Sequence, residues 1–243
     1  ISQRKKIDLT LLSLTVILII FGLVMVYDAS VIQALKDFND GYYYIRQQMI
    51  WVVLGFASLF FFSQFSYTHF RKFSLFLLLG SLVLLVGVFI PGLGISGGGA
   101  HRWLRIGPIT IQPAEIIKLT GIIFLAHLFE KKIRTFPFIS LVMVVTIITA
   151  VLQKDLGSTI VFVGVATLIY FAAGGPLWHF LISIPPVFIA LVALITTSSY
   201  RSKRVLAFLD PFSDTQGYTY HISQVLIALG SGGLFGLGLG QSR

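Results

Sequence analysis

The sequence predicts an all-α polytopic membrane protein, and three observations lead to this class. Hydrophobic residues make up 56% of the 243 residues and charged residues only 11%, whereas charged residues approach a quarter of an ordinary soluble domain. The mean hydropathy is +0.91. The apolar residues also fall into blocks of about 17 to 20, the length that a helix needs to cross the hydrocarbon core of a bilayer. These observations exclude an ordinary soluble domain.

Seven apolar blocks predict about seven transmembrane helices. The blocks are residues 9–27, 48–65, 73–90, 113–129, 136–152, 158–173 and 180–197. Basic residues precede the first block and gather again in residues 71–72 and 131–134. The positive-inside rule places these clusters in the cytoplasm, and with them the N-terminus. We therefore expect residues 1–243 to form one membrane domain, in which residues 198–243 begin a large extracytoplasmic loop.

The formal net charge of +9 would suggest a nucleic-acid partner in a soluble protein. Here much of it lies in the short loops between apolar blocks. Membrane lipids are therefore the expected acidic partner, and no nucleic acid is expected. The sequence has no cysteine, which excludes disulfides and thiolate metal ligands, and its histidines lack the spacing of a metal site.

The predicted outer segment between the third and fourth blocks is rich in glycine and then presents Arg102, Trp103 and Arg105. Two interpretations stay open. The segment is a flexible loop in which Trp103 anchors the boundary between membrane and water, or a cation beside an indole binds an anionic, partly apolar ligand such as a lipid phosphate. The glycine run lacks the spacing of a nucleotide-binding loop, so it predicts no nucleotide site.

The fourth block carries a carboxylate and an ammonium within apolar sequence. Glu115 and Lys118 are three residues apart, and Pro113 is suited to start a helix, so both side chains should share one helix face. Charges in a bilayer are costly and usually face a polar cavity or each other. The pair is therefore a candidate functional site, and an ion pair that only satisfies itself is the alternative.

Lys154 and Asp155 lie at the predicted outer junction of the fifth and sixth blocks. By the count of spans they share the outer half of the membrane domain with Glu115 and Lys118. One outward-opening polar cavity could therefore collect all four side chains. The alternative for Asp155 is a structural role as the N-cap of the sixth helix.

A basic cluster, Tyr200-Arg-Ser-Lys-Arg204, lies on the face that the positive-inside rule predicts to be poor in Lys and Arg. Either the count of spans is wrong by one, or these cations are held outside to bind an anionic headgroup. Residues 208–214 predict a turn, with Asp214 as a candidate cap for an amphipathic or re-entrant helix over residues 220–229.

Five stretches spread over the whole chain occur in the order of a known family. They are residues 99–103, 106–118, 153–157, 204–213 and 224–240. These stretches resemble the SEDS family of bacterial cell-wall proteins, whose members include FtsW and RodA, and two of the motifs resemble FtsW more than RodA. The resemblance implies a multi-span glycosyltransferase of the bacterial cytoplasmic membrane. Such a protein polymerises peptidoglycan from lipid II at the outer face, with a class B penicillin-binding protein as partner.

The resemblance also implies which residues act. The substrate-binding candidates are cations and an indole that would hold the diphosphate-bearing lipid: Arg102, Trp103, Lys154 and Arg204. The catalytic candidates are ionisable residues: Glu115, Lys118 and Asp155. Lys154 stands where the family usually has a proline, which changes the local turn and adds a charge.

The family continues beyond a Gly-Leu-Gly segment like residues 238–240 into the rest of its outer loop. That loop bears the aspartate usually proposed as catalytic, and about three more helices follow it. We therefore expect this chain to be part of a longer protein. A divalent cation could share the charge of a diphosphate, but no residue pattern indicates one. A lipid II flippase and a non-catalytic scaffold for a penicillin-binding protein are the alternative functions.

Overall fold

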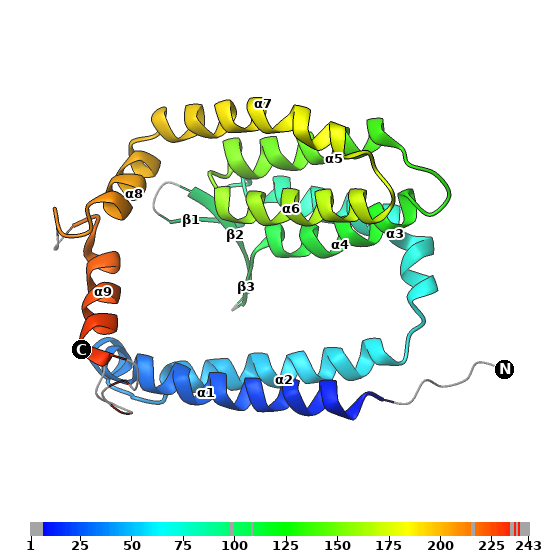
Figure 1. The fold of residues 1–243 in the computed structure, drawn as a ribbon. Coiled ribbons are helices and arrows are strands. Elements are labelled where there is room, and N and C mark those ends of the chain that lie inside the picture. Colours follow the sequence, from blue (N-terminus) through cyan, green and yellow to red (C-terminus); the bar gives the residue numbers. More distant parts are fainter. Residues whose placement is uncertain are drawn as a thin grey trace. The chain divides into compact units, whose positions relative to one another are not determined.

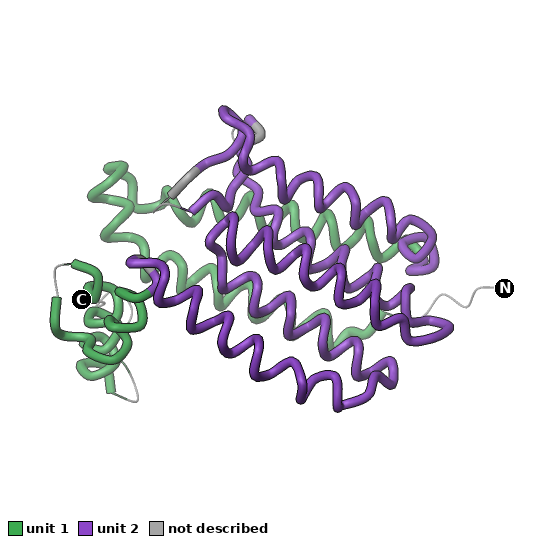
Figure 2. Tube along the Cα trace, turned by 90° about the horizontal axis from the view of Figure 1, so that it is seen from above, with its two compact units in different colours: residues 1–65, 202–243 green, residues 66–201 purple. Residues whose placement is uncertain are grey.

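The computed structural model describes residues 7–97, 100–107, 109–214, 217–233, 236 and 238. These residues form mostly helices, with one small sheet (Figure 1). The chain divides into two compact units (Figure 2). Unit 1 contains residues 1–65 and 202–243, and unit 2 contains residues 66–201. The end of the stretch over residues 224–240 lies outside the described residues.

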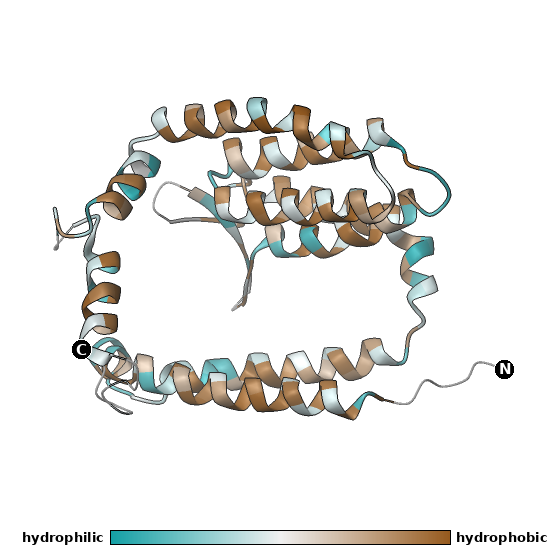
Figure 3. Ribbon diagram, in the orientation of Figure 1, coloured by the Kyte–Doolittle hydropathy of each residue, from teal (hydrophilic) through white to brown (hydrophobic). Residues whose placement is uncertain are grey.

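Each apolar block of the sequence corresponds to a helical segment, although five blocks run one to three residues past the end of their helix. In chain order the helices are α1 (Leu9–Phe38), α2 (Tyr43–Ser63), α3 (Tyr67–Gly87), α4 (Pro113–Leu128), α5 (Thr135–Thr146), the π-helix η1 (Ile147–Leu152), α6 (Leu156–Ala172), α7 (Leu177–Thr196), α8 (Ser199–Leu209) and α9 (Tyr220–Gly232). Hydrophobic residues cover most of the helical surface (Figure 3).

Five helical segments of the described chain are long and apolar enough to cross a membrane: α1, α2, α3, α5 continued by η1, and α7. The helices α4 and α6 are shorter, with 16 and 17 residues. The class of helical polytopic membrane protein is therefore confirmed. Seven crossings, a cytoplasmic N-terminus, a single membrane domain and a large outer loop remain predictions.

In unit 1, α1 and α2 pack against each other and are joined by a short turn. Helix α1 continues eleven residues past the predicted block, because its sequence stays compatible with a helix after it ceases to be apolar. Asn39 ends it in the left-handed conformation with φ of 54°. The rings of Tyr27 and Tyr42 stack 5.5 Å apart across the turn, and Arg46 forms an ion pair with Asp40.

The segments at the end of unit 1 are helical as well. Helix α8 was not expected, and α9 corresponds to the helix predicted over residues 220–229. The expected cap was wrong, because Thr219 is the N-cap of α9. Asp214 instead accepts a hydrogen bond from the backbone N–H of Tyr218 at 3.3 Å. It therefore stabilises the turn that precedes α9.

In unit 2, the glycine-rich segment is a three-stranded antiparallel sheet rather than a flexible loop. The strands β1 (Gly94–Gly97), β2 (Ala100–Ile106) and β3 (Ile109–Ile111) pair in the order β1-β2-β3. Gly94 is required where the chain turns back on the end of α3, since a Cβ there would lie 1.9 Å from the carbonyl oxygen of Val88. The sheet gives Arg102 and Trp103 fixed positions.

The core of unit 2 lies among α3, α4, α5 and α6. Its fully buried side chains include Leu85, Ile117, Leu125, Val145 and Phe162. Burial inside a bilayer gives little hydrophobic driving force, so close packing and interhelical hydrogen bonds hold such helices together. The hydroxyls of Ser81 on α3 and Thr120 on α4 provide one such hydrogen bond, with 2.7 Å between the oxygens.

Candidate functional site

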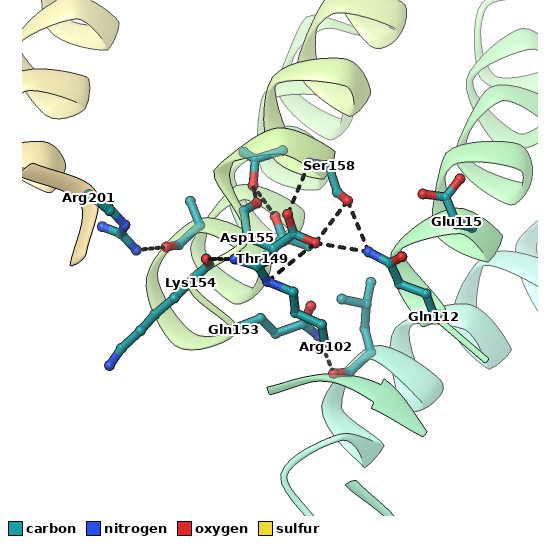
Figure 4. Close-up of polar contacts among 12 residues, drawn as sticks. Arg102, Gln112, Glu115, Thr149, Gln153, Lys154, Asp155, Ser158 and Arg201 are labelled. Carbon is teal, nitrogen blue, oxygen red and sulfur yellow. Dashed lines mark hydrogen bonds and ion pairs between the residues drawn. The ribbon is translucent and has the colours of Figure 1, made fainter. Parts of the chain in front are cut away.

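A polar cluster around Asp155 lies where the start of α4, the strand β2 and the turn between η1 and α6 meet (Figure 4). The side chain of Asp155 is only 8% exposed. A buried carboxylate is costly unless hydrogen bonds and nearby cations compensate for the lost water. The surroundings of Asp155 provide both.

The backbone before α6 fixes where this carboxylate lies. The π-helix η1 ends at Gln153, and Lys154 follows in the left-handed conformation with φ of 57°. This reversal lets the backbone N–H of Asp155 donate to the carbonyl of Thr149 at 2.8 Å. Asp155 is then the N-cap of α6, and its Oδ1 accepts from the N–H of Ser158 at 3.2 Å. The predicted capping role is confirmed.

The second carboxylate oxygen of Asp155 accepts two further hydrogen bonds and forms an ion pair. Its Oδ2 accepts from the hydroxyl of Ser158 at 2.9 Å and from Nε2 of Gln112 at 3.0 Å. Nε of Arg102 lies 4.0 Å from the same oxygen. Gln112 immediately precedes Pro113, the first residue of α4, so the carboxylate joins the starts of α4 and α6.

Arg102 connects the sheet to the turn before α6. Its Nη2 donates to the carbonyl oxygen of Lys154 at 2.6 Å, in addition to the ion pair with Asp155. On the other side of the turn, Nε2 of the fully buried Gln153 donates to the carbonyl of Leu85 at 2.8 Å. The turn from Gln153 to Asp155 is thus held by both β2 and the end of α3.

Glu115 and Lys118 form a second polar group on α4. Their ion pair, 2.7 Å between Lys118 Nζ and Glu115 Oε2, confirms that they share one helix face. The side chain of Glu115 is 59% exposed and that of Lys118 is 21% exposed. Lys118 also lines a small cleft with Phe162 and Ala166 of α6. Lys118 therefore faces a space that α6 also lines.

A common cavity for the four charged side chains stays a prediction. No described hydrogen bond or ion pair links Glu115 or Lys118 to Asp155. Only the backbone carbonyl of Lys154 takes part in the Asp155 cluster, and its side chain projects away (Figure 4). The left-handed backbone at Lys154 explains this, because it directs the carbonyl and the side chain to different sides.

Trp103 lies on β2 and Arg204 on α8. Trp103 is 42% exposed and follows Arg102 on β2. Ile95 pairs with Trp103 and Ser96 with His101, so Arg102 is the extra residue of a bulge in this strand. Arg204 lies on α8 in unit 1. Their roles in substrate binding therefore remain predictions.

The Asp155 cluster does not have the composition of a metal site. Within the described ranges, no three His, Cys, Asp or Glu side chains gather where they could hold a metal ion. Divalent cations such as magnesium prefer several oxygen ligands, whereas Asp155 is surrounded by hydrogen-bond donors.

Sequence analysis missed the neutral members of the cluster. No role was predicted for Gln112, Gln153 and Ser158, because the predictions rested on charged residues. Each lies at the end of an apolar block, within three residues of a candidate site residue. A polar amide or hydroxyl at such a junction is the signal that could have identified them.

Comparison with known proteins gives a family. A family model described as a cell cycle protein, and named for FtsW, RodA and SpoVE, matches residues 9–243. The chain is 36% identical over 250 residues to the probable peptidoglycan glycosyltransferase FtsW of Geobacter metallireducens, with 100% of this chain and 67% of that protein covered. It is also 36% identical over 256 residues to the stage V sporulation protein E of Bacillus subtilis, with 100% of this chain and 68% of that protein covered. The chain thus spans about two thirds of the length of these relatives.

Two solved structures have a fold similar to that of this chain. A chain of a peptidoglycan synthase complex, described as coordinating polymerization and crosslinking, matches with a TM-score of 0.69 and 25% identity over 90% of this chain and 65% of that chain. The rod shape determining protein RodA of Thermus thermophilus matches with a TM-score of 0.55 and 20% identity over 93% of this chain and 86% of that chain. The second likeness is one of fold alone.

Proposed function

The chain belongs to the family of cell cycle proteins that includes FtsW, RodA and SpoVE, and from this premise we propose that it is part of a peptidoglycan glycosyltransferase. In this proposal the protein polymerises lipid II into glycan strands at the outer face of the bacterial cytoplasmic membrane, during division or elongation. Lipid II is its substrate, and a class B penicillin-binding protein and membrane lipids are its partners.

The Asp155 cluster is the observation that carries the proposal. It brings together residues 99–103, 106–118 and 153–157, three stretches of the resemblance that are far apart in the sequence, through the contacts of Arg102, Gln112 and Asp155. A polar group at one end of several apolar helices suits a ligand with a charged headgroup and a lipid tail. Lipid II has this chemistry.

The reaction needs cations for the leaving diphosphate and a base for the attacking sugar hydroxyl. Arg102, Lys118 and Lys154 are the candidate cations within unit 2. Glu115 holds the ammonium of Lys118. Both oxygens of Asp155 already accept hydrogen bonds. We therefore assign Asp155 the task of positioning Arg102, and expect the base in the part of the relatives that this chain does not span.

The test uses the complete protein, purified in detergent, with purified lipid II. We expect Glu115→Ala and Lys118→Ala each to abolish polymer formation while the protein stays folded. Folding is checked by thermal unfolding and by elution as a single species. Normal polymerisation by both variants would remove these residues from the site.

The same assay separates the alternative functions. Detergent micelles have no two leaflets, so a lipid II flippase would make no glycan there. A non-catalytic scaffold would likewise make no glycan, and its binding to the penicillin-binding protein would survive the loss of Glu115 and Lys118. Long glycan made by the wild-type protein, and by neither variant, supports the polymerase.

A further inference from the structure

Arg201 is buried, although it belongs to the basic cluster of residues 200–204 that was expected to bind an anionic headgroup. The residue is 9% exposed. Its guanidinium donates two hydrogen bonds to backbone carbonyls, from Nη1 to Leu194 at 3.0 Å and from Nη2 to Ala150 at 2.7 Å. A guanidinium held in this way has little surface left for a headgroup.

The two carbonyls belong to the ends of two helices. Leu194 lies in the last turn of α7, and Ala150 lies in η1 three residues before Gln153. The last carbonyls of a helix lack intrahelical donors and carry partial negative charge. The carbonyls on either side of Leu194 already have donors: the backbone N–H of Thr197 donates to Ala193, and that of Ser198 donates to Ile195. Arg201 therefore provides a cationic donor that both helix ends lack.

The segment that Arg201 holds is the one that positions Asp155. The turn that follows η1 is held by Gln153, which donates to Leu85, and by Arg102, which donates to Lys154. Arg201 holds the same segment one turn earlier (Figure 4). Two arginines from different parts of the chain thus fix η1 and the turn after it.

We propose that Arg201 is a positioning residue, which ties the end of α7 to η1 and thereby sets the place of Asp155 and Arg102. It does not touch the substrate. The inference rests on the proposed function, because it takes the Asp155 cluster as part of the polymerase site. If Arg201 bound an anionic headgroup, its positive charge would suffice. In the positioning role the geometry of the guanidinium matters as well as its charge.

The conservative variant Arg201→Lys separates geometry from charge. A lysine ammonium is a point charge that cannot reproduce the planar fork of arginine. We expect Arg201→Lys to lower the polymerisation rate of the complete protein by about tenfold to a hundredfold, the effect of a small misplacement of a site. Val205→Ala, a charge-neutral change at an exposed position of the same helix, is the matched control and should leave the rate unchanged.

A distance measurement reports the positioning directly. Spin labels at Val151→Cys in η1 and Val192→Cys in α7, both exposed positions, should give a narrow distance distribution in the wild-type background. We expect Arg201→Lys to broaden it and Val205→Ala to leave it narrow. Arg201→Ala should broaden it further, provided that thermal unfolding shows that this variant folds.

Each outcome decides the inference. Broadening together with a slower rate supports it. A narrow distance distribution in Arg201→Lys overturns the inference, and so does a broadened distribution with an unchanged rate. It is also overturned if Arg201→Ala raises the KM for lipid II and Arg201→Lys has the wild-type KM. If the wild-type protein makes no glycan, the proposed function fails. The distances then still decide whether Arg201 ties the two helix ends together.

Discussion

Nε2 of Gln112 donates a hydrogen bond to Oδ2 of Asp155 at 3.0 Å, although 43 residues separate them in the sequence. The same amide nitrogen lies 3.3 Å from the hydroxyl of Ser158. Gln112 stands immediately before α4 and Asp155 immediately before α6, so this contact joins the starts of two helices. A neutral residue therefore supplies part of the hydrogen bonding that replaces the water lost by the buried carboxylate of Asp155.

We predict that Gln112→Glu inactivates the complete protein more strongly than Gln112→Ala. A glutamate would remove a donor and place a second negative charge beside Asp155, whereas alanine removes only the donor. The loss of one hydrogen bond to a charged group costs about 1.5–3 kcal/mol, which corresponds to about a tenfold or larger effect on rate for Gln112→Ala. Polymerisation of lipid II and thermal unfolding are the measurements. Equal rates for wild type and Gln112→Glu would show that the contact is unimportant.

The helices could be predicted from the sequence because a bilayer requires long apolar segments, and hydropathy detects these directly. The limits of the helices followed less well. Helix α1 extends to Phe38 because helix formation does not stop where hydropathy falls. The sheet was missed because it depends on pairing between residues apart in sequence, such as Leu104 with Ile111, while the local signal was only a run of glycines.

In the candidate site, too, the sequence predicted the local contacts and missed those between distant residues. The ion pair of Glu115 with Lys118 and the capping by Asp155 are local, three residues apart, so spacing alone predicted them. The contact of Arg102 with the carbonyl of Lys154 spans 52 residues. Neither its partner nor its geometry follows from composition or periodicity. The burial of Arg201 was missed for the same reason, since a backbone carbonyl leaves no trace in the sequence.

The next prediction concerns whether the Glu115 and Lys118 pair only satisfies itself. A charge swap, Glu115→Lys with Lys118→Glu, preserves an ion pair but moves the cation by almost one turn. We expect the swap to restore the thermal stability lost in either single variant, a small amount because the pair is partly exposed, about 0–1 kcal/mol. We do not expect it to restore polymerisation, because Lys118 lies against Phe162 and Ala166 of α6. Full activity of the swapped protein would support the purely structural alternative.

Arg102→Lys should lower polymerisation at least about tenfold, because a single ammonium cannot both donate to the carbonyl of Lys154 and pair with Asp155 as the guanidinium does. Arg105→Lys is the matched control, since Arg105 is an exposed residue of the same strand. We expect the control to keep the wild-type rate. If Arg102→Lys is as active as the control, the substrate needs only a positive charge at this position.

The packing of α4 on α6 gives the last prediction. A Cβ on Gly121 would lie 2.7 Å from Cε2 of the buried Phe162, so Gly121→Ala forces the ring or the helix to move, at a cost of about 1–3 kcal/mol in unfolding free energy. At Gly164, on α6, a Cβ would meet nothing within 4 Å. Gly164→Ala is therefore the matched control, and it should stabilise the protein by up to about 1 kcal/mol through helix propensity.

Relief of the clash provides the decisive comparison. Phe162→Leu removes the ring edge that the new methyl group would meet, so Gly121→Ala should cost less in the Phe162→Leu background than in the wild type. Because α4 begins beside Gln112 and α6 beside Asp155, the same displacement should weaken their contact and slow polymerisation in step with the loss of stability. Equal unfolding free energies for Gly121→Ala and Gly164→Ala would mean that α4 and α6 are not in close contact, and the geometry of the Asp155 cluster would then lose its support.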